Sequence, residues 1–114
     1  MASKSEVGDA LERLMARLDG NETNVRSAIP GHKVLRCRVP DVGSTWYSVI
    51  DDGHVSPPIE QPPDDGHVDV TLQVNSDDLI DLVEERTSFL SAFLSGKVRV
   101  DASFTDLLRM RNLL

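Results

Sequence analysis

The chain is poor in cysteine and in aromatic residues. Its 114 residues include one cysteine, and phenylalanine, tyrosine and tryptophan together make up only 4%. Cys37 cannot form an intramolecular disulfide, which fits a reducing compartment. No run approaches the roughly 20 apolar residues that span a bilayer, and the acidic start lacks the apolar core of a signal peptide. We expect one small domain, residues 1–114, in the cytoplasm.

Positive charge is missing from the middle of the chain. The net charge is −7, and residues 39–85 contain twelve carboxylates but no lysine or arginine. Nucleic-acid binding needs a basic surface that displaces counterions, so we expect no nucleic-acid partner. Transient contact with an anionic membrane would fall on the bases of the flanks, with internal pairing to the acidic middle as the alternative. These bases are Arg36, Arg38, Lys97, Arg99, Arg109 and Arg111.

Motifs that carry catalysis or hold cofactors are also missing. There is no Gly-x-Ser-x-Gly turn, no glycine-rich phosphate loop and no cysteine pair. Cys37 lies between Arg36 and Arg38, but alternation along a strand places the arginines on the other face, which favours a core cysteine over a nucleophile. The repeat Asp-Asp-Gly-His, at 51–54 and 64–67, offers metal ligands, yet Asp-Gly is equally the chemistry of a tight turn. We predict no catalytic residue, no metal site and no cofactor.

Hydrophobic periodicity divides the chain into helices and strands. Apolar residues that recur every three or four positions predict helices, whereas strict alternation of apolar and polar residues predicts strands. The fold class is therefore α+β, with a largely antiparallel five-stranded sheet and helices packed on one face. The expected elements are an N-terminal helix over 1–20, a strand meander over 33–74 that includes strands at 54–59 and 67–74, a helix pair over 76–95, a last strand over 97–102 and a terminal helix over 103–114.

Apolar residues are concentrated after position 78. Helices as apolar as these either fill an ordinary core or wall a cavity for an apolar ligand, and the pattern alone leaves both open. The residues are Leu79, Ile80, Leu82, Val83, Phe89, Leu90, Phe93, Leu94, Phe104, Leu107, Leu108, Met110, Leu113 and Leu114.

From about residue 33 to the end, the chain resembles the sterol carrier protein type-two domain family. An alternating acidic strand at 68–74 leads into a polar helix start, Asp77-Asp78-Leu79. The string Ala-Phe-Leu-Ser-Gly-Lys at 92–97 is the most specific match, and Trp46 is similar to the family's strand tryptophan. Ala102 departs from the family, which usually has glycine there, so the corner after the last strand is expected to differ in shape.

The resemblance implies a function in lipid binding. The family binds or transfers an apolar lipid without catalysis, such as a fatty acyl chain, an acyl-CoA or a sterol-like molecule, in an internal hydrophobic tunnel between sheet and helices. The alternative is a small interaction module that dimerises or serves an enzyme partner without holding a ligand. The expected oligomeric state is accordingly either a monomer or a homodimer. The tunnel lining implied by the resemblance is Leu79, Leu82, Val83, Phe89, Phe93, Leu94, Phe104, Leu107 and Leu108.

Overall fold

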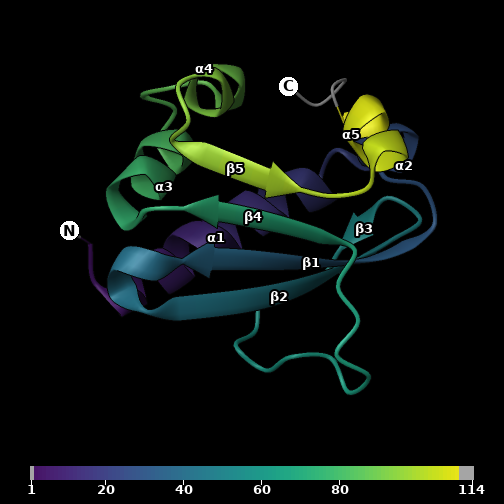
Figure 1. Ribbon diagram of the computed structural model, residues 1–114, viewed down its shortest axis with the longest axis horizontal. Coiled ribbons are helices and arrows are strands. Elements are labelled where there is room, and N and C mark those ends of the chain that lie inside the picture. Colours follow the sequence, from purple (N-terminus) through teal and green to yellow (C-terminus); the bar gives the residue numbers. More distant parts are fainter. Residues whose placement is uncertain (1, 111–114) are drawn as a thin grey trace.

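The computed structural model of the protein describes residues 2–110 (Figure 1). The last four residues of the predicted terminal helix, 111–114, lie outside this range. The α+β class predicted from the sequence is confirmed. The elements are α1 (Lys4–Asp19), α2 (Glu22–Ala28), β1 (His32–Val39), the 3-10 turn η1 (Pro40–Val42), β2 (Ser44–Asp51), β3 (His54–Val55), β4 (Val70–Val74), α3 (Ser76–Val83), α4 (Phe89–Leu94), β5 (Val98–Asp101) and α5 (Phe104–Met110).

The sheet is mixed, with the strand order β3-β2-β1-β4-β5. Three of its four strand pairs are antiparallel, as predicted, but β4 runs parallel to β1 at the centre. The chain therefore crosses the sheet after β3 instead of continuing the meander predicted over 33–74. Pro57 and Pro58 lack the backbone N–H groups that a longer ladder between β2 and β3 would need. β3 therefore pairs over two residues instead of the predicted 54–59.

The start of β4 also differs from the prediction. The alternating pattern predicts a strand from residue 67, whereas β4 begins at Val70. The Asp69 carboxylate accepts the Val34 N–H at 2.8 Å and contacts the His67 ring at 2.8 Å. The Asp69 side chain thus takes the place of a backbone carbonyl as the acceptor for Val34. The regular ladder with β1 starts at the next residue, Val70.

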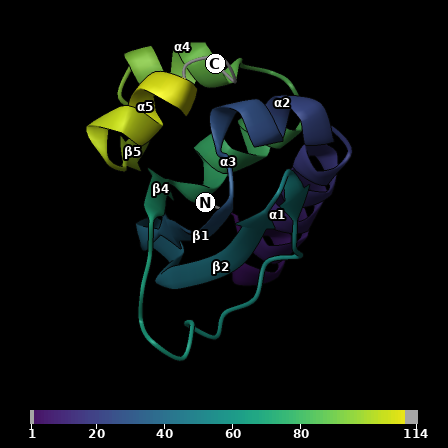
Figure 2. The same cartoon turned by 90° about the vertical axis from the view of Figure 1, so that its right-hand side faces the viewer.

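The helices gather on one face of the sheet (Figure 2). The long helix α1 begins with the predicted capping box, in which Ser3 and Glu6 exchange side-chain and backbone hydrogen bonds. Its apolar stripe reaches two groups of buried side chains, one around Leu11 and one around Met15. Fully burying side chains of this size stabilises the fold by about 1.5–3 kcal/mol each, so α1 holds the two halves of the core together.

The carboxylate of Asp41, in η1, caps α3 although the two are far apart in the sequence. Asn75 precedes α3 but makes no side-chain capping bond. The Asp41 carboxylate instead accepts the Ser76 N–H at 2.9 Å and the Ser76 hydroxyl at 2.6 Å. These hydrogen bonds, led by that of the Ser76 side chain, hold the pKa of Asp41 below its ordinary value. The connection between β1 and β2 is thereby fastened to the start of α3.

A tight turn joins β2 to β3, as the dipeptide Asp52-Gly53 predicts. Both residues have positive φ, 49° for Asp52 and 87° for Gly53, which is the conformation of a two-residue hairpin turn. A Cβ on Gly53 would lie 2.6 Å from the Glu22 carbonyl oxygen. The turn therefore requires glycine both for its backbone angle and for its close approach to α2.

We expect Asp41→Ala to lower the free energy of unfolding by about 1–3 kcal/mol at neutral pH, because the buried Ser76 N–H loses its acceptor. Since the pKa of Asp41 is lowered by folding, its stabilisation is complete above the unfolded-state pKa of about 3.9 and is lost as pH falls through the lower folded value. Urea unfolding followed by Trp46 fluorescence should show the difference between the two proteins shrinking below about pH 4. Asp64→Ala, in an exposed loop, is the control; equal stability of Asp41→Ala and wild type at pH 7 would contradict this assignment.

Gly53→Ala should destabilise the protein more than Gly66→Ala does. Both glycines have positive φ, but nothing lies within 4 Å of a Cβ on Gly66. In the control variant, Gly66→Ala, the free energy of unfolding should therefore fall only by the conformational cost of about 1–2 kcal/mol. In Gly53→Ala it should fall by at least about twice as much, because the new Cβ also clashes with α2. The two unfolding free energies measure this directly, and equal losses would show that the contact with Glu22 relaxes freely.

Candidate functional site

An apolar groove lies between α1, α3 and the connection from α3 to α4. Leu14, Leu82 and Phe89 provide its apolar side chains, and its volume is about 470 Å³. Arg17, Glu85 and Arg86 stand at its rim, with Thr87 and Ser88. The dimensions lie within the range of about 300–1,000 Å³ that small-molecule sites occupy.

The turn after α3 shapes one wall of this groove. Glu85 adopts a left-handed conformation with φ 60°, and the Arg86 N–H donates to the Asp81 carbonyl at 2.8 Å. This is the hydrogen-bond pattern that closes a helix around a left-handed residue. Ser88 then caps α4 by accepting the Ser91 N–H at 3.1 Å. The two motifs fix where α4 begins and so place Phe89 against the groove.

Charged groups at the rim are paired with one another. Arg17 donates to the Val83 carbonyl at 2.8 Å and lies 3.8 Å from the Glu85 carboxylate. Arg86 donates to Asp81 at 2.8 Å and also to Glu84, and these hydrogen bonds raise the pKa of the guanidinium further. The groove consequently offers apolar contact without an unpaired charge on its rim.

The nine residues implied as tunnel lining are not brought together in the described structure. Leu82 and Phe89 lie in the groove, and Leu79 and Val83 are buried in the core beside it. Phe93 is half-buried on α4. The other four are exposed on α4 and α5, namely Leu94, Phe104, Leu107 and Leu108. The assignment of these nine residues to a lining stays a prediction.

A charged contact decides how α5 faces the molecule. Asp106 is only 6% exposed, and its carboxylate lies 3.6 Å from the Lys33 amine on β1. Its backbone N–H donates to the Ser103 hydroxyl at 3.1 Å, which caps the helix. Because Asp106 faces inward, the apolar stripe of α5 is turned outward, and Phe104 is 76% exposed. The single acid within an apolar stripe was the sequence signal for this arrangement, and periodicity alone overlooks it.

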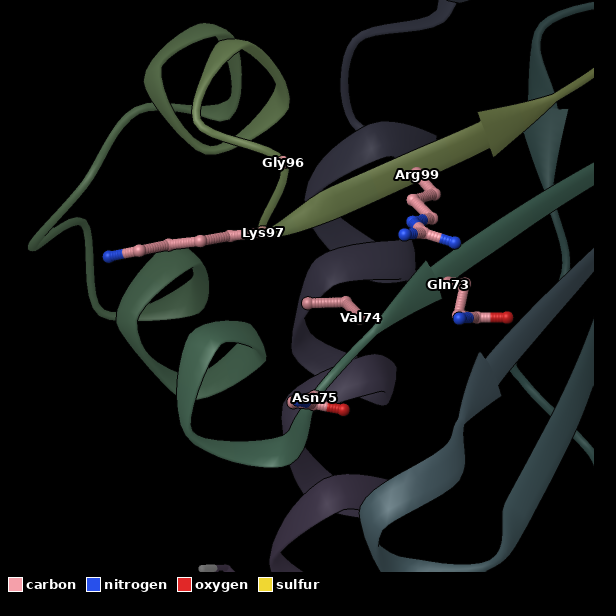
Figure 3. Close-up of a pocket in the computed structure, with 6 residues that line it drawn as sticks. All are labelled: Gln73, Val74, Asn75, Gly96, Lys97 and Arg99. Carbon is pink, nitrogen blue, oxygen red and sulfur yellow. The ribbon is translucent and has the colours of Figure 1, made fainter.

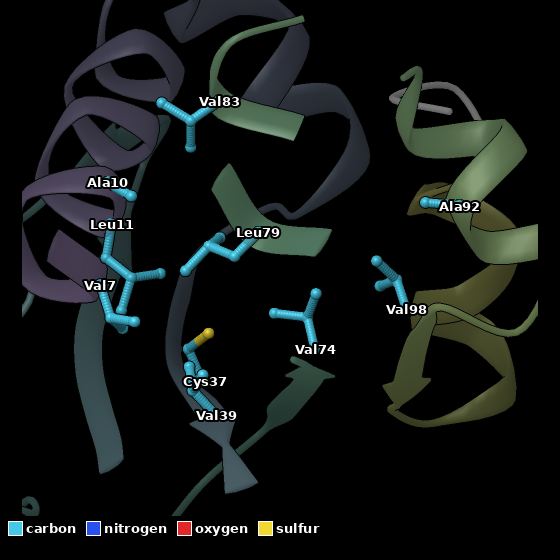
Figure 4. Packing of buried hydrophobic residues seen from close by; sticks show 10 residues of the cluster. All are labelled: Val7, Ala10, Leu11, Cys37, Val39, Val74, Leu79, Val83, Ala92 and Val98. Atoms are coloured by element: carbon cyan, nitrogen blue, oxygen red, sulfur yellow. The ribbon is translucent and has the colours of Figure 1, made fainter. Parts of the chain in front are cut away.

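Ten buried side chains form the core beside the groove (Figure 4). They come from α1, β1, β4, α3, α4 and β5. Cys37 is among them, and burial raises the pKa of its thiol to about 12. The thiol is therefore protonated at neutral pH, which confirms the interpretation of Cys37 as a core residue and removes it as a nucleophile.

A second, polar hollow of about 240 Å³ lies at the edge of the sheet, where β4 ends and β5 begins (Figure 3). The Arg99 guanidinium points toward the Gln73 side chain, while the Lys97 side chain extends away from both. Asn75 and Gly96 complete the lining together with Val74. This hollow is separate from the apolar groove, since the two share no residue.

The repeated Asp-Asp-Gly-His segments lead to two different places. His54 lies within 3.7 Å of Asp19 and 3.5 Å of Glu22, at the junction of α1 and α2, whereas His67 contacts Asp69 ahead of β4. Within residues 2–110, no three histidine, cysteine or acidic side chains are grouped as a metal site. None of the described helices combines the length and the apolar character needed to cross a bilayer.

Solved structures with the same fold differ in size and context. The ubiquinone synthesis protein UbiJ-SCP2 matches with a TM-score of 0.64 and 21% identity, over 96% of this chain and 91% of that one. Sterol carrier protein 2 like 2 from Aedes aegypti matches with a TM-score of 0.61 and 18% identity, over 97% and 98%. The sec-alkylsulfatase Pisa1 from Pseudomonas sp. matches with a TM-score of 0.58 and 19% identity, but the chain spans only 15% of that enzyme.

Sequence comparison extends beyond the shared fold. A search against curated protein sequences finds no significant match. The model of the SCP-2 sterol transfer family matches residues 9–114, which include the groove, all five strands and the buried residues of both core clusters apart from Val7. The resemblance in the strand over 68–74 and in the string over 92–97 is thus part of a match over nearly the whole chain, and the chain belongs to the SCP-2 sterol transfer family.

Proposed function

We propose that this protein binds and carries an apolar lipid in the cytoplasm without catalysing a reaction. The ligand class is a fatty acyl chain, an acyl-CoA or a sterol-like molecule. The apolar groove formed by Leu14, Leu82 and Phe89, in a chain of the SCP-2 sterol transfer family, is the observation that supports this function. Each methylene of a bound chain that leaves water would contribute about 0.8 kcal/mol.

The groove is the proposed opening of an internal tunnel between the sheet and the helices. Leu79 and Val83 are buried on α3, the helix that also presents Leu82 to the groove. A ligand that passes Leu82 would next meet this apolar wall. The paired charges of Arg17 and Glu85 at the rim leave a carboxylate or other polar end of the ligand at the water interface.

The burial of Cys37, the one cysteine of the sequence, supports carriage over catalysis. The Cys37 thiol is held protonated by burial. The similarity to the sec-alkylsulfatase spans 15% of that enzyme, a share that favours this fold as an accessory part of a larger enzyme and does not carry the sulfatase reaction to the present chain.

Exposed apolar residues on α4 and α5 favour a second candidate, an interaction module. Leu94 on α4 is 74% exposed, and Leu107 and Leu108 are exposed on α5, the last described helix. Large exposed apolar patches commonly mark protein interfaces. The match to the ubiquinone synthesis protein UbiJ-SCP2 supports an accessory role of this kind, in which the chain would dimerise or serve an enzyme without holding a ligand.

Phe89→Ser should weaken binding of a fluorescent fatty acid, such as cis-parinaric acid, by roughly tenfold or more. The substitution removes an aromatic wall of the groove, and burial of a large apolar side chain against a ligand exceeds the 1.4 kcal/mol that corresponds to tenfold. Leu90→Ser is the matched control, because Leu90 follows on the same helix but is exposed and outside the groove. A saturable titration gives both affinities; equal affinity of folded Phe89→Ser and wild type would place the ligand elsewhere.

Native mass spectrometry of gently purified protein should show a single chain with a bound adduct of lipid mass. The lipid carrier needs only its own groove for binding, so light scattering should give the mass of a monomer at every concentration. The interaction module predicts the opposite pattern, a dimer without an adduct, and Leu108→Asp should then restore the monomer because the charge would be buried at the interface.

A further inference from the structure

Basic residues without an acidic partner gather on one side of the molecule. Of the eleven bases within residues 2–109, six form ion pairs within 4.0 Å. Four of the five others lie on or beside the open face of the sheet, and the fifth, Arg13, is on α1. In a protein of net charge −7, a group of four unpaired bases on one side of the molecule gives that side a distinct charge. The four are Arg36, Arg38, Lys97 and Arg99.

Strand register fixes the spacing of these cations. Arg38 on β1 and Arg99 on β5 both lie opposite Gln73 on β4. Neighbouring strands are about 4.8 Å apart, so the two arginine backbones are roughly 10 Å apart across one row. In the next row, Arg36 donates to the Thr71 hydroxyl at 3.2 Å. Beyond Thr71 lies Asp101, the one acid of β5, opposite Thr71 in the register.

Exposed apolar side chains flank the same edge strand. β5 is the last strand of the sheet, and α4 and α5 stand at its two ends (Figure 1). Leu94, at the end of α4, is 74% exposed, and Phe104, at the start of α5, is exposed to a similar degree. The edge thus combines cations with large apolar groups, whereas a site for an acidic peptide or a free anion would need the cations alone.

We propose that the edge formed by α4, β5 and α5 docks on an anionic phospholipid surface. Lys97 and Arg99 meet lipid phosphates, with Arg38 behind them on the sheet, and Leu94 and Phe104 enter the boundary between headgroups and acyl chains. A cationic strip with adjacent exposed apolar side chains is the combination that holds proteins at an anionic interface. The inference rests on the proposed function, since a lipid carrier must meet a membrane to collect and release its ligand.

Flotation with vesicles tests this surface. Wild-type protein should bind vesicles of equimolar phosphatidylcholine and phosphatidylglycerol at low ionic strength, bind pure phosphatidylcholine vesicles far less, and lose binding as salt is added. Lys97→Gln combined with Arg99→Gln should weaken binding to the anionic vesicles by roughly tenfold or more. Asp101→Asn should strengthen it, because this removes the one acid of the strand. Arg13→Gln is the matched control, an unpaired base on another element, and should bind like wild type.

A second set of measurements separates the membrane from other anions. Leu94→Ser should weaken vesicle binding, whereas a site for soluble phosphate would not respond to it. If inorganic phosphate or a water-soluble phosphate ester competes fully with vesicles at millimolar concentration, the edge is a small-anion site and the membrane inference is overturned. Equal losses in Arg13→Gln and in the double variant would overturn it as well, because attraction would then be unspecific.

Failure of this inference is distinguishable from failure of the proposed function. Wild-type protein that binds cis-parinaric acid in solution but no anionic vesicle overturns the docking edge and leaves the carrier. Wild-type protein that binds anionic vesicles through Lys97 and Arg99 but no fatty acid in solution supports the edge and removes the carrier.

Discussion

The parallel pairing of β4 with β1 determines where every later element lies. It opposes Arg36 to Thr71 and Arg38 to Gln73, and it ends β4 next to η1, where Asp41 can cap α3. α3 is thereby held against α1, and the groove forms at their junction. The same pairing leaves β5 as the free edge of the sheet. The apolar groove on the helical side and the cationic edge are thus two consequences of one strand placement.

Features set by neighbouring residues could be predicted from the sequence. The capping box at Ser3, the Asp52-Gly53 turn and the core position of Cys37 depend on local spacing and alternation, and the structure confirms them. The partner of β4 could not be predicted, because alternation shows which face of a strand is buried but does not name the strand beside it. The prolines at 57 and 58 limited β3, yet gave no sign that the chain would cross the sheet.

The site was less predictable than the fold. Leu82 and Phe89 belong to apolar helical patterns, and both reach the groove, but the same pattern included Leu94 and Phe104, which are exposed. A helical stripe gives the spacing of apolar side chains but does not determine which face of a short helix packs against the core, that is, its rotation about its own axis. In α4 and α5 this rotation depends on contacts between residues far apart in the sequence, such as that between Asp106 and Lys33. Leu14, in the first helix, joined the groove only through tertiary packing with α3.

The orientation of α5 carries an energetic consequence. A buried carboxylate is stable only with a partner, and the Lys33 amine supplies one for Asp106. In return, three large apolar side chains of α5 stay partly in water, namely Phe104, Leu107 and Leu108, and each forgoes part of the roughly 1.5–3 kcal/mol that full burial would contribute. A short helix that exposes this much apolar surface gains stability from anything apolar that covers it. A lipid surface does so without changing the contact between Asp106 and Lys33, which is why the exposed stripe and the unpaired bases of the adjoining strand are best explained together.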